Sequence, residues 1–281
     1  LRKIMVFYGR FTPSYTQIGY RTRALFWRDP KPDFAGQTWL VTGASGGLGR
    51  FMALEAARLG ATVIAVARNQ SKLDQVVADA RAKGADRIET AVCDFSLQAD
   101  TQRLVNDLVG HGRKIDVLVN NASSFYPTAY GDSTQAQWDD LVGSNLRGAY
   151  FLTQQLSAEL TANFGAVVNL TDTHADRALP KHPIYSIAKA GLKAMTKSLA
   201  IELAPRVRAN GVSPGAILWP PSLEDDNDPA VEAGRQTMLA GIPLAKLGKM
   251  QDIADTVYFV ACEATYLTGQ TIKVDGGRSL R

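Results

Sequence analysis

Residues 42–49 read Thr-Gly-Ala-Ser-Gly-Gly-Leu-Gly and directly follow the apolar stretch 38–41. Glycines allow a tight turn here and let the backbone approach a pyrophosphate, while the helix that starts after the turn offers free N–H groups and the positive end of its dipole. A single glycine is common in any strand–helix turn, but the spacing Thr-Gly-x-x-x-Gly-x-Gly at the start of a β-α-β unit predicts a dinucleotide site. The residues expected to contact the dinucleotide are Gly43, Ser45, Gly47, Leu48 and Gly49.

Outward from this turn, strand-like and helix-like segments alternate along the chain. Apolar strands are predicted at 38–41, 61–67, 88–92, 115–120, 166–170, 208–212 and 270–274. Helices are predicted from the glycine turn to residue 59 and at 71–83, 97–109, 134–160, 185–203 and 250–262. Continuous apolar strands separated by helices favour a parallel sheet covered on both faces. Right-handed crossovers then give a seven-stranded, doubly wound, Rossmann-like α/β fold.

The composition fits one large α/β domain. The chain has 281 residues, of which 46% are hydrophobic and 21% charged, and no apolar run approaches the roughly 20 residues of a membrane span. We expect a domain at 37–281 preceded by an arm at 1–36. The two cysteines lie far apart and the three histidines form no helical pair, so no metal site is expected. This cysteine usage suits a reducing compartment, and a cytoplasmic location is predicted.

The arm carries the basic excess of the chain. Seven basic and two acidic residues give residues 1–36 a charge of +5, so the remainder is near −1 although the whole chain has a net charge of +4. A nearly neutral main domain argues against nucleic-acid binding. The arm also holds eight aromatic residues and lacks the cleavage site of a signal peptide. Packing on the domain is the favoured interpretation, and contact with a membrane surface or partner, or a processing remnant, are the alternatives.

The end of the second predicted strand bears on the choice of dinucleotide. Sites that prefer NAD usually place an acid there, whereas this chain has Ala67 followed by Arg68. A guanidinium suits the 2′-phosphate of NADP(H), and a solvated surface arginine is the alternative. Asp94 follows the third strand and can accept a hydrogen bond from an adenine amino group, or cap the turn before Ser96.

Tyr185 and Lys189 lie four residues apart, so on a helix they share one face. An ammonium near a phenol favours the phenolate, which predicts a tyrosine pKa below its usual value of about 10. Such a tyrosine can donate or accept the proton that accompanies hydride transfer. The pair is predicted at the carboxyl ends of the strands, where open parallel sheets bind ligands.

These motifs together resemble the short-chain dehydrogenase/reductase family. The matching stretches are TGASGGLG (42–49), Asn120-Asn121-Ala122, Asn145, YSIAK (185–189) and Pro214-Gly215. The resemblance implies that Tyr185 is the proton donor, Lys189 a ribose ligand that lowers its pKa, and Asn145 the holder of a water relay. It also implies cofactor contacts from Asn121, Ala122, Pro214 and Gly215.

Members of the family commonly form dimers or tetramers, so a homo-oligomer is expected. The pairing surface would be the helices at 134–160 and 185–203. The second of these carries apolar residues beyond what packing on the sheet requires, namely Ala188, Leu192, Met195 and Leu199.

Asp172 departs from the family pattern. It stands thirteen residues before Tyr185, where most members have a serine that binds the substrate carbonyl. An ionised carboxylate cannot donate to a ketone oxygen, but it suits a protonated ring nitrogen, or delivers a proton itself if burial raises its pKa. A C=N substrate is therefore predicted. The alternative is a hydroxyl supplied by Thr171 or Thr173.

From about residue 120 onward the chain is similar to pteridine reductases. The matching residues are NNASSFYPT (120–128), the set Asp172, Tyr185 and Lys189, and PGAILW (214–219). This resemblance implies that Ser123 and Phe125 form the pterin site, with the phenyl ring sandwiching the pterin against nicotinamide. Trp219 would wall the pocket. Ordinary loop packing of Phe125 and rim packing of Trp219 are the alternatives.

The favoured hypothesis is an NADPH-dependent oxidoreductase that reduces a C=N bond of a pterin or dihydrofolate-like small molecule. One alternative is a reductase of ketone or quinone carbonyls, and another is a nucleotide-binding regulatory protein without turnover. The long insertion at 216–245 is predicted to form a lid, and its acidic run at 224–228 a solvated surface.

Overall fold

The computed structural model describes residues 33–220, 223 and 229–281. The chain divides between Phe34 and Ala35 into two units, of which the second comprises residues 35–281. Nearly all of the arm and the acidic run at 224–228 lie outside the described residues, so the expectations for both stay predictions.

A sheet of seven parallel strands lies at the centre of the described part of the chain. The strands are β1 (Thr38–Thr42), β2 (Thr62–Ala67), β3 (Ile88–Val92), β4 (Val117–Asn120), β5 (Ala166–Leu170), β6 (Arg208–Pro214) and β7 (Thr271–Val274). Their order is β3-β2-β1-β4-β5-β6-β7. Strands β1 to β3 are added toward one edge of the sheet and β4 to β7 toward the other, so the strand order reverses between β1 and β4. The predicted Rossmann-like, doubly wound fold is confirmed. The reversal point is where such sheets bind dinucleotides.

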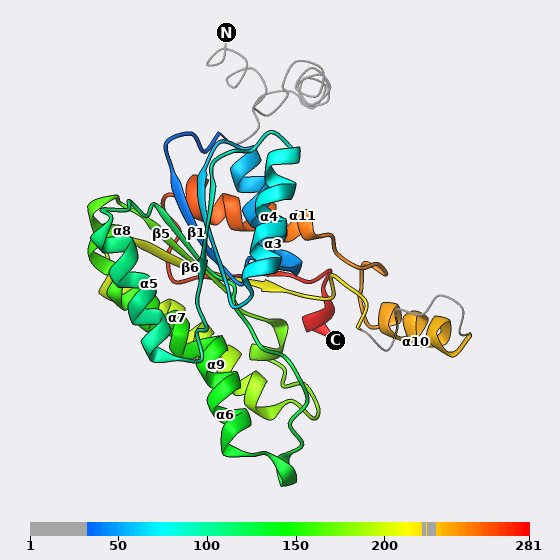
Figure 1. The fold of residues 1–281 in the computed structure, drawn as a ribbon. Helices are drawn as coiled ribbons and strands as arrows, with labels where there is room; N and C mark the ends of the chain where they lie inside the picture. Colours follow the sequence, from blue (N-terminus) through cyan, green and yellow to red (C-terminus); the bar gives the residue numbers. More distant parts are fainter. Residues whose placement is uncertain (1–32, 221–222, 224–228) are drawn as a thin grey trace, which may run out of the picture. The chain divides into compact units, whose positions relative to one another are not determined.

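Helices cover both faces of the sheet (Figure 1). One layer holds α3 (Gly47–Arg58), α4 (Gln70–Ala82) and α11 (Met250–Tyr258). The other holds α5 (Gln98–Gly110), α7 (Gly148–Gln155), α8 (Ser157–Ala162) and α9 (Pro183–Glu202). Helix α6 (Gln135–Val142) packs on α9, and α10 (Pro229–Ala240) lies in the insertion predicted to be a lid.

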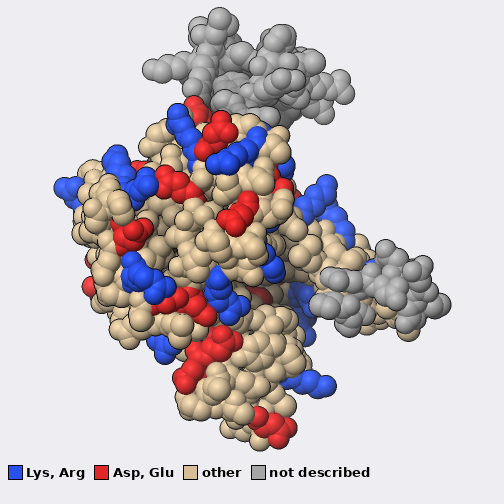
Figure 2. Space-filling view, viewed as in Figure 1, with Lys and Arg blue, Asp and Glu red and all other residues tan. Residues whose placement is uncertain are grey.

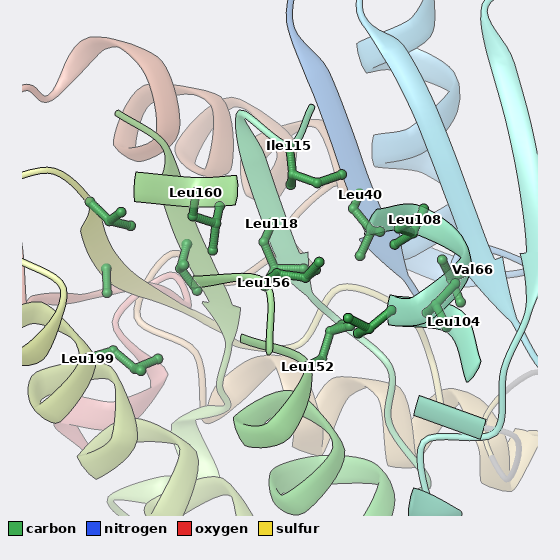
Figure 3. Close-up of a cluster of buried hydrophobic side chains, with 14 of the residues drawn as sticks. Leu40, Val66, Leu104, Leu108, Ile115, Leu118, Leu152, Leu156, Leu160 and Leu199 are labelled. Atoms are coloured by element: carbon green, nitrogen blue, oxygen red, sulfur yellow. The ribbon is translucent and has the colours of Figure 1, made fainter. Parts of the chain in front are cut away.

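The side chains of the five inner strands β1, β2, β4, β5 and β6 are almost all buried on both faces, whereas those of the edge strands β3 and β7 are mostly partly exposed. On one face, Leu40 and Leu118 meet Leu152 and its neighbours from the helices (Figure 3). On the other, Trp39 packs edge-on against Tyr258 of α11, with ring centroids 5.5 Å apart. Four apolar residues of α9 were predicted to be more than its packing on the sheet requires. They are buried within this chain, with exposures of 8% or less: Ala188, Leu192, Met195 and Leu199.

The helix predicted at 134–160 is interrupted. After α6 comes the wide π-helical turn η2 (Gly143–Arg147), and then α7 and α8. The break lies where the helix packs closely on the loop after β3, since a Cβ on Gly148 would lie 2.6 Å from the Cβ of Phe95. Arg147 Nη2 also donates to the Ser96 carbonyl oxygen at 2.6 Å. The turn therefore fits the helix against the loop that follows β3.

The helix predicted at 250–262 also ends in a π-helical turn, η5 (Phe259–Glu263), after α11. The Arg208 guanidinium binds carbonyl oxygens of this turn, with Nη1 lying 2.6 Å from that of Val260. The side chain thus satisfies carbonyls that a regular helix end leaves free.

Basic and acidic side chains are intermixed over the face seen in Figure 2. Among the described residues, no helix has both the length and the apolar character needed to cross a membrane.

Candidate active site

The glycine turn between β1 and α3 is shaped by close backbone approach. Gly43 has φ = +66°, and a Cβ there would lie 2.8 Å from Ala122 Cα. A Cβ on Gly49 would lie only 2.3 Å from Asn121 Nδ2. Asn121 Nδ2 donates to the Thr42 carbonyl oxygen at 2.9 Å, which ties the end of β4 to the turn. The two segments therefore form one rigid corner at the reversal point of the sheet.

A cleft of about 570 Å³ opens at this corner. Seven of the predicted cofactor or substrate residues line it: Gly43, Ser45, Arg68, Asp94, Asn121, Ala122 and Ser123. Gly47, Leu48 and Gly49 form the first turn of α3, whose N-cap, Gly46, makes no side-chain cap bond. The N-terminal N–H groups of α3 and the missing Cβ atoms suit a pyrophosphate. These residues fit a dinucleotide.

Two cations stand at one end of this cleft. Arg68 and Lys72 both line it, and within the described residues neither cationic head has an ion-pair partner. Sequence reasoning missed Lys72, although a second cation in the first turn of α4 was a usable signal. The carboxylate of Asp94 also lines the cleft, and its Oδ1 accepts from Ser96 N at 2.9 Å. Oδ1 of Asp94 therefore caps the turn before Ser96, as the alternative predicted. Oδ2 is the oxygen that an adenine amino group would use.

Tyr185 and Asp172 form a hydrogen-bonded pair. The Tyr185 hydroxyl donates to Asp172 Oδ2 at 2.6 Å, and Asp172 Oδ1 accepts from His174 N at 2.8 Å. The pair meets because Asp172 follows the end of β5, while α9 begins at Pro183 and places Tyr185 in its first turn. The tyrosine is only 5% exposed. The carboxylate is thus held against the predicted proton donor.

Lys189 is buried one turn further along α9, and its Nζ donates to the Leu170 carbonyl oxygen at 2.9 Å. Burial lowers the pKa of Lys189 to about 8, against the opposing effect of the charge on Asp172. Burial, and then the charge of Asp172, raise the pKa of Tyr185 above its usual value. The expectation that Lys189 lowers the tyrosine pKa is therefore wrong for this structure. The raised pKa favours the protonated phenol, which is the form that donates to Asp172.

Asn145 lies in the π-helical turn η2 and is 1% exposed. Its Nδ2 donates to the carbonyl oxygens of Ser124 and Leu141, both at 2.9 Å. Its Oδ1 accepts from the Ser123 hydroxyl at 2.7 Å. The turn thus connects Asn145 to a residue that lines the dinucleotide cleft.

Phe125 forms an aromatic group with two residues of the α9 start. Its ring stacks on His182, with centroids 4.7 Å apart and planes 9° apart, and meets Tyr185 edge-on at 4.8 Å. Phe125 is 58% exposed, so it keeps surface for a flat ligand. Sequence reasoning missed the contact of His182, and no motif pointed to it, because its ring partner lies 57 residues away along the chain.

The remaining predicted residues follow β6. Pro214 ends that strand, and a Cβ on Gly215 would lie 2.6 Å from Asp275 Cα, so the chain passes closely beside the end of β7. The Trp219 ring packs under the Arg235 guanidinium of α10 at 5.2 Å. The cation that contacts the Trp219 ring thus belongs to the same insertion, which fits the alternative that Trp219 packs at the rim of the pocket.

Comparisons with known proteins identify the family of the chain. Residues 43–279 match the family model described as enoyl-(acyl carrier protein) reductase. A 3-oxoacyl-[acyl-carrier-protein] reductase of Staphylococcus aureus is 36% identical over 244 residues, covering 85% of this chain and 96% of the relative. The enzyme of the same name from Thermotoga maritima is 33% identical over 245 residues, covering 86% and 97%.

Solved structures show the same likeness. A glucose/ribitol dehydrogenase of Brucella melitensis has a TM-score of 0.77 and 28% identity, covering 88% of this chain and 98% of that one. A variant of actinorhodin polyketide ketoreductase solved with NADPH has a TM-score of 0.78 and 27% identity, covering 87% and 98%. With the parallel sheet, the glycine corner and the Tyr185–Lys189 pair, these matches show that the chain belongs to the short-chain dehydrogenase/reductase family of NAD(P)-dependent oxidoreductases.

Proposed function

We propose that the protein is an NADPH-dependent reductase of a C=N bond in a pterin or dihydrofolate-like heterocycle. The observation that carries the proposal is the hydrogen bond from Tyr185 Oη to Asp172 Oδ2 at 2.6 Å. It puts a carboxylate, and not the hydroxyl usual for the family, beside the Tyr185 phenol.

This pair suits nitrogen chemistry. Reduction of C=N requires hydride at carbon and a proton at nitrogen. An ionised carboxylate can only accept, so Asp172 binds an N–H of a ring, and when it takes up a solvent proton it can pass that proton to the ring nitrogen. Tyr185 holds its own proton and donates to Asp172, so it orients the carboxylate.

The cofactor proposed is NADP(H), which supplies the hydride when bound. Arg68 and Lys72 would hold its 2′-phosphate, because both line the cleft and guanidinium and ammonium groups bind phosphate well. Phe125 would support a flat, electron-poor ring through its exposed aromatic surface. Ser123 would contact the same ring, since it lies between the cleft and Asn145.

A reductase of ketone carbonyls is the second candidate, and the names of the Staphylococcus and Thermotoga relatives favour it. A ketone oxygen needs a hydroxyl donor besides Tyr185. Thr171 Oγ1 already donates to the Val212 carbonyl oxygen at 3.1 Å, and Thr173 Oγ1 to Asp172 Oδ1 at 3.3 Å. These bonds favour the C=N candidate.

The proposal also includes a cytoplasmic homo-oligomer. Apolar side chains on α7 and α9 support the subunit pairing, since Tyr150, Ile187 and Ile201 are 43%, 52% and 76% exposed. These residues, and not the buried ones named from sequence, are the ones a partner copy would cover.

The deciding experiment measures NADPH oxidation with dihydrobiopterin, dihydrofolate and a panel of ketones and quinones under one set of conditions. The proposal expects turnover of a pterin substrate at a kcat/KM at least tenfold above that of any ketone. Turnover of carbonyl substrates alone would establish the second candidate.

A further inference from the structure

We propose that a second cleft, of about 360 Å³, binds an anionic group carried by the substrate, either a carboxylate or a phosphate. The cleft lies between the loop after β5, the end of α10 and the turn η6 (Arg278–Leu280). Because it concerns the substrate of the Asp172–Tyr185 pair, the inference rests on the proposed function.

Charge is the first support. The cleft is lined by three arginines, Arg177, Arg278 and Arg281, and by His174, and no Asp or Glu side chain is among its lining residues in the described part of the chain. Guanidinium groups bind carboxylates and phosphates through paired N–H donors. Three of them around a hollow of this size are suited to one anionic group.

The nearby carboxylates are engaged elsewhere. Asp176 binds Lys193 and Lys273, the latter at 3.0 Å, and these two bonds hold the pKa of Asp176 below its usual range. Asp275 accepts from Gly277 N at 2.9 Å and Ser279 N at 2.8 Å. Neither acid lines the cleft, so neither neutralises its arginines there.

Contact with the candidate active site is the second support. Thr173 and His174 line the cleft, and both bond to Asp172 Oδ1, through the Thr173 hydroxyl at 3.3 Å and the His174 N–H at 2.8 Å. The other carboxylate oxygen accepts from Tyr185. A substrate whose reacting bond lies at this pair can therefore extend a tail along the loop toward the arginines.

The opposite wall is fixed by hydrogen bonds of both side chains and backbone, which hold the cleft in shape before a ligand arrives. Asp275 secures η6, and Leu244 N donates to the Gly276 carbonyl oxygen at 3.1 Å. Arg281 Nη1 donates to the Ala240 carbonyl oxygen at 3.1 Å, which connects the turn to the end of α10. An ordered site loses less free energy on binding than a loose one.

The test compares two substrates with the same reacting ring. Dihydrofolate carries a glutamate tail with two carboxylates, and dihydrobiopterin carries none. In the double variant Arg177→Gln/Arg278→Gln, the ratio of kcat/KM for dihydrofolate to that for dihydrobiopterin should fall at least tenfold. The matched control is Arg81→Gln/Arg87→Gln, which removes two charges from exposed positions on the α4 side, and it should keep the parental ratio. Retention of the parental ratio in the cleft variant would overturn the inference.

A binding measurement separates this inference from the proposed function. The protein, saturated with NADPH so that the cofactor cleft is filled, is titrated with glutarate and, separately, with inorganic phosphate. Binding of either anion that weakens at least tenfold in the cleft variant, and not in the control, supports the site even if no pterin is turned over. Preference for glutarate identifies a carboxylate tail, and preference for phosphate a phosphorylated one. Equal binding by parent and cleft variant, or no binding of either anion to the parent, would refute it.

Discussion

The Tyr185 hydroxyl is bound to the carboxylate of Asp172, thirteen residues earlier in the chain, at 2.6 Å. Burial and the negative charge of Asp172 raise the pKa of Tyr185, so the phenol of the pair stays protonated. Chemistry at this site then depends on what the carboxylate can do. A serine at the same position would leave the phenol as the sole acid and would add a second neutral donor.

Replacing Asp172 should change the class of substrate. Asp172→Asn keeps the shape but cannot take up or deliver a proton, so kcat with dihydrobiopterin should fall by about 100-fold or more. Asp172→Ser should lose a similar amount and gain turnover of ketones. Steady-state NADPH oxidation with both substrates measures this. If Asp172→Ser reduces dihydrobiopterin at the parental rate, the role assigned to the carboxylate is wrong.

The buried Lys189 predicts a pH-dependent stability. Its pKa falls to about 8 in the folded protein, whereas an unfolded lysine has a pKa of about 10.4. Between these values the unfolded state binds more protons, so the free energy of unfolding should rise with pH, by at most about 1.4 kcal/mol per pH unit. Above pH 10 the raised pKa of Tyr185 opposes the rise, because only the unfolded tyrosine ionises there.

Urea unfolding at pH 7.5, 8.5 and 9.5 measures this slope. The control is Lys189→Met, in which the rise attributed to the lysine should disappear. A slope that is the same in the two proteins would show that Lys189 is not the titrating group.

The two cations in the dinucleotide cleft predict cofactor choice. Arg68→Ala should raise the Kd for NADPH by about 10- to 100-fold relative to that for NADH, which lacks the 2′-phosphate, because a hydrogen bond to a charged group contributes about 1.5–3 kcal/mol. Lys72→Ala should shift the same ratio by a smaller factor. Fluorescence titration with each cofactor gives the ratio, and Lys83→Ala, an exposed lysine at the end of α4, is the control. Equal losses for both cofactors would remove the 2′-phosphate role.

The glycine corner predicts a stability effect. Gly49→Ala places a Cβ 2.3 Å from both Asn121 Nδ2 and the Gly43 carbonyl oxygen, so it should reduce the free energy of unfolding by about 1–3 kcal/mol. Gly46→Ala, three residues earlier, is the control, since no described atom lies within 4 Å of its added Cβ. Its cost should stay below about 1 kcal/mol. Chemical denaturation of the two variants measures both free energies of unfolding. A Gly49→Ala protein as stable as the parent would contradict the close packing at the glycine corner.

The fold was predictable because strands such as β1, β2 and β4 are buried on both faces and are therefore almost wholly apolar in sequence. The Tyr185–Asp172 contact was also within reach, since one residue follows β5 and the other begins the helix after it. The direction in which the pKa of Tyr185 shifts could not be predicted, because it depends on burial and on which group the phenol contacts. Sequence spacing places Lys189 on the same helix face but does not show that its ammonium binds Leu170.

The stack of His182 on Phe125 and the gathering of Arg177 with Arg278 were also beyond sequence reasoning. Each joins segments that lie far apart along the chain and carry no shared pattern. Likewise, the interruption of the 134–160 helix lies beside Phe95, and Gly148, which allows the close approach, looks like any other helical glycine in the sequence.

That interruption has a consequence for evolution and engineering. A π-helical turn holds one residue more than an α-helical turn needs. Deleting Ser144 would restore a regular helix and rotate Asn145, the next residue, by roughly 100° away from the Ser123 hydroxyl. The hydrogen bond between Asn145 and Ser123 therefore depends on the number of residues in this turn as much as on their types.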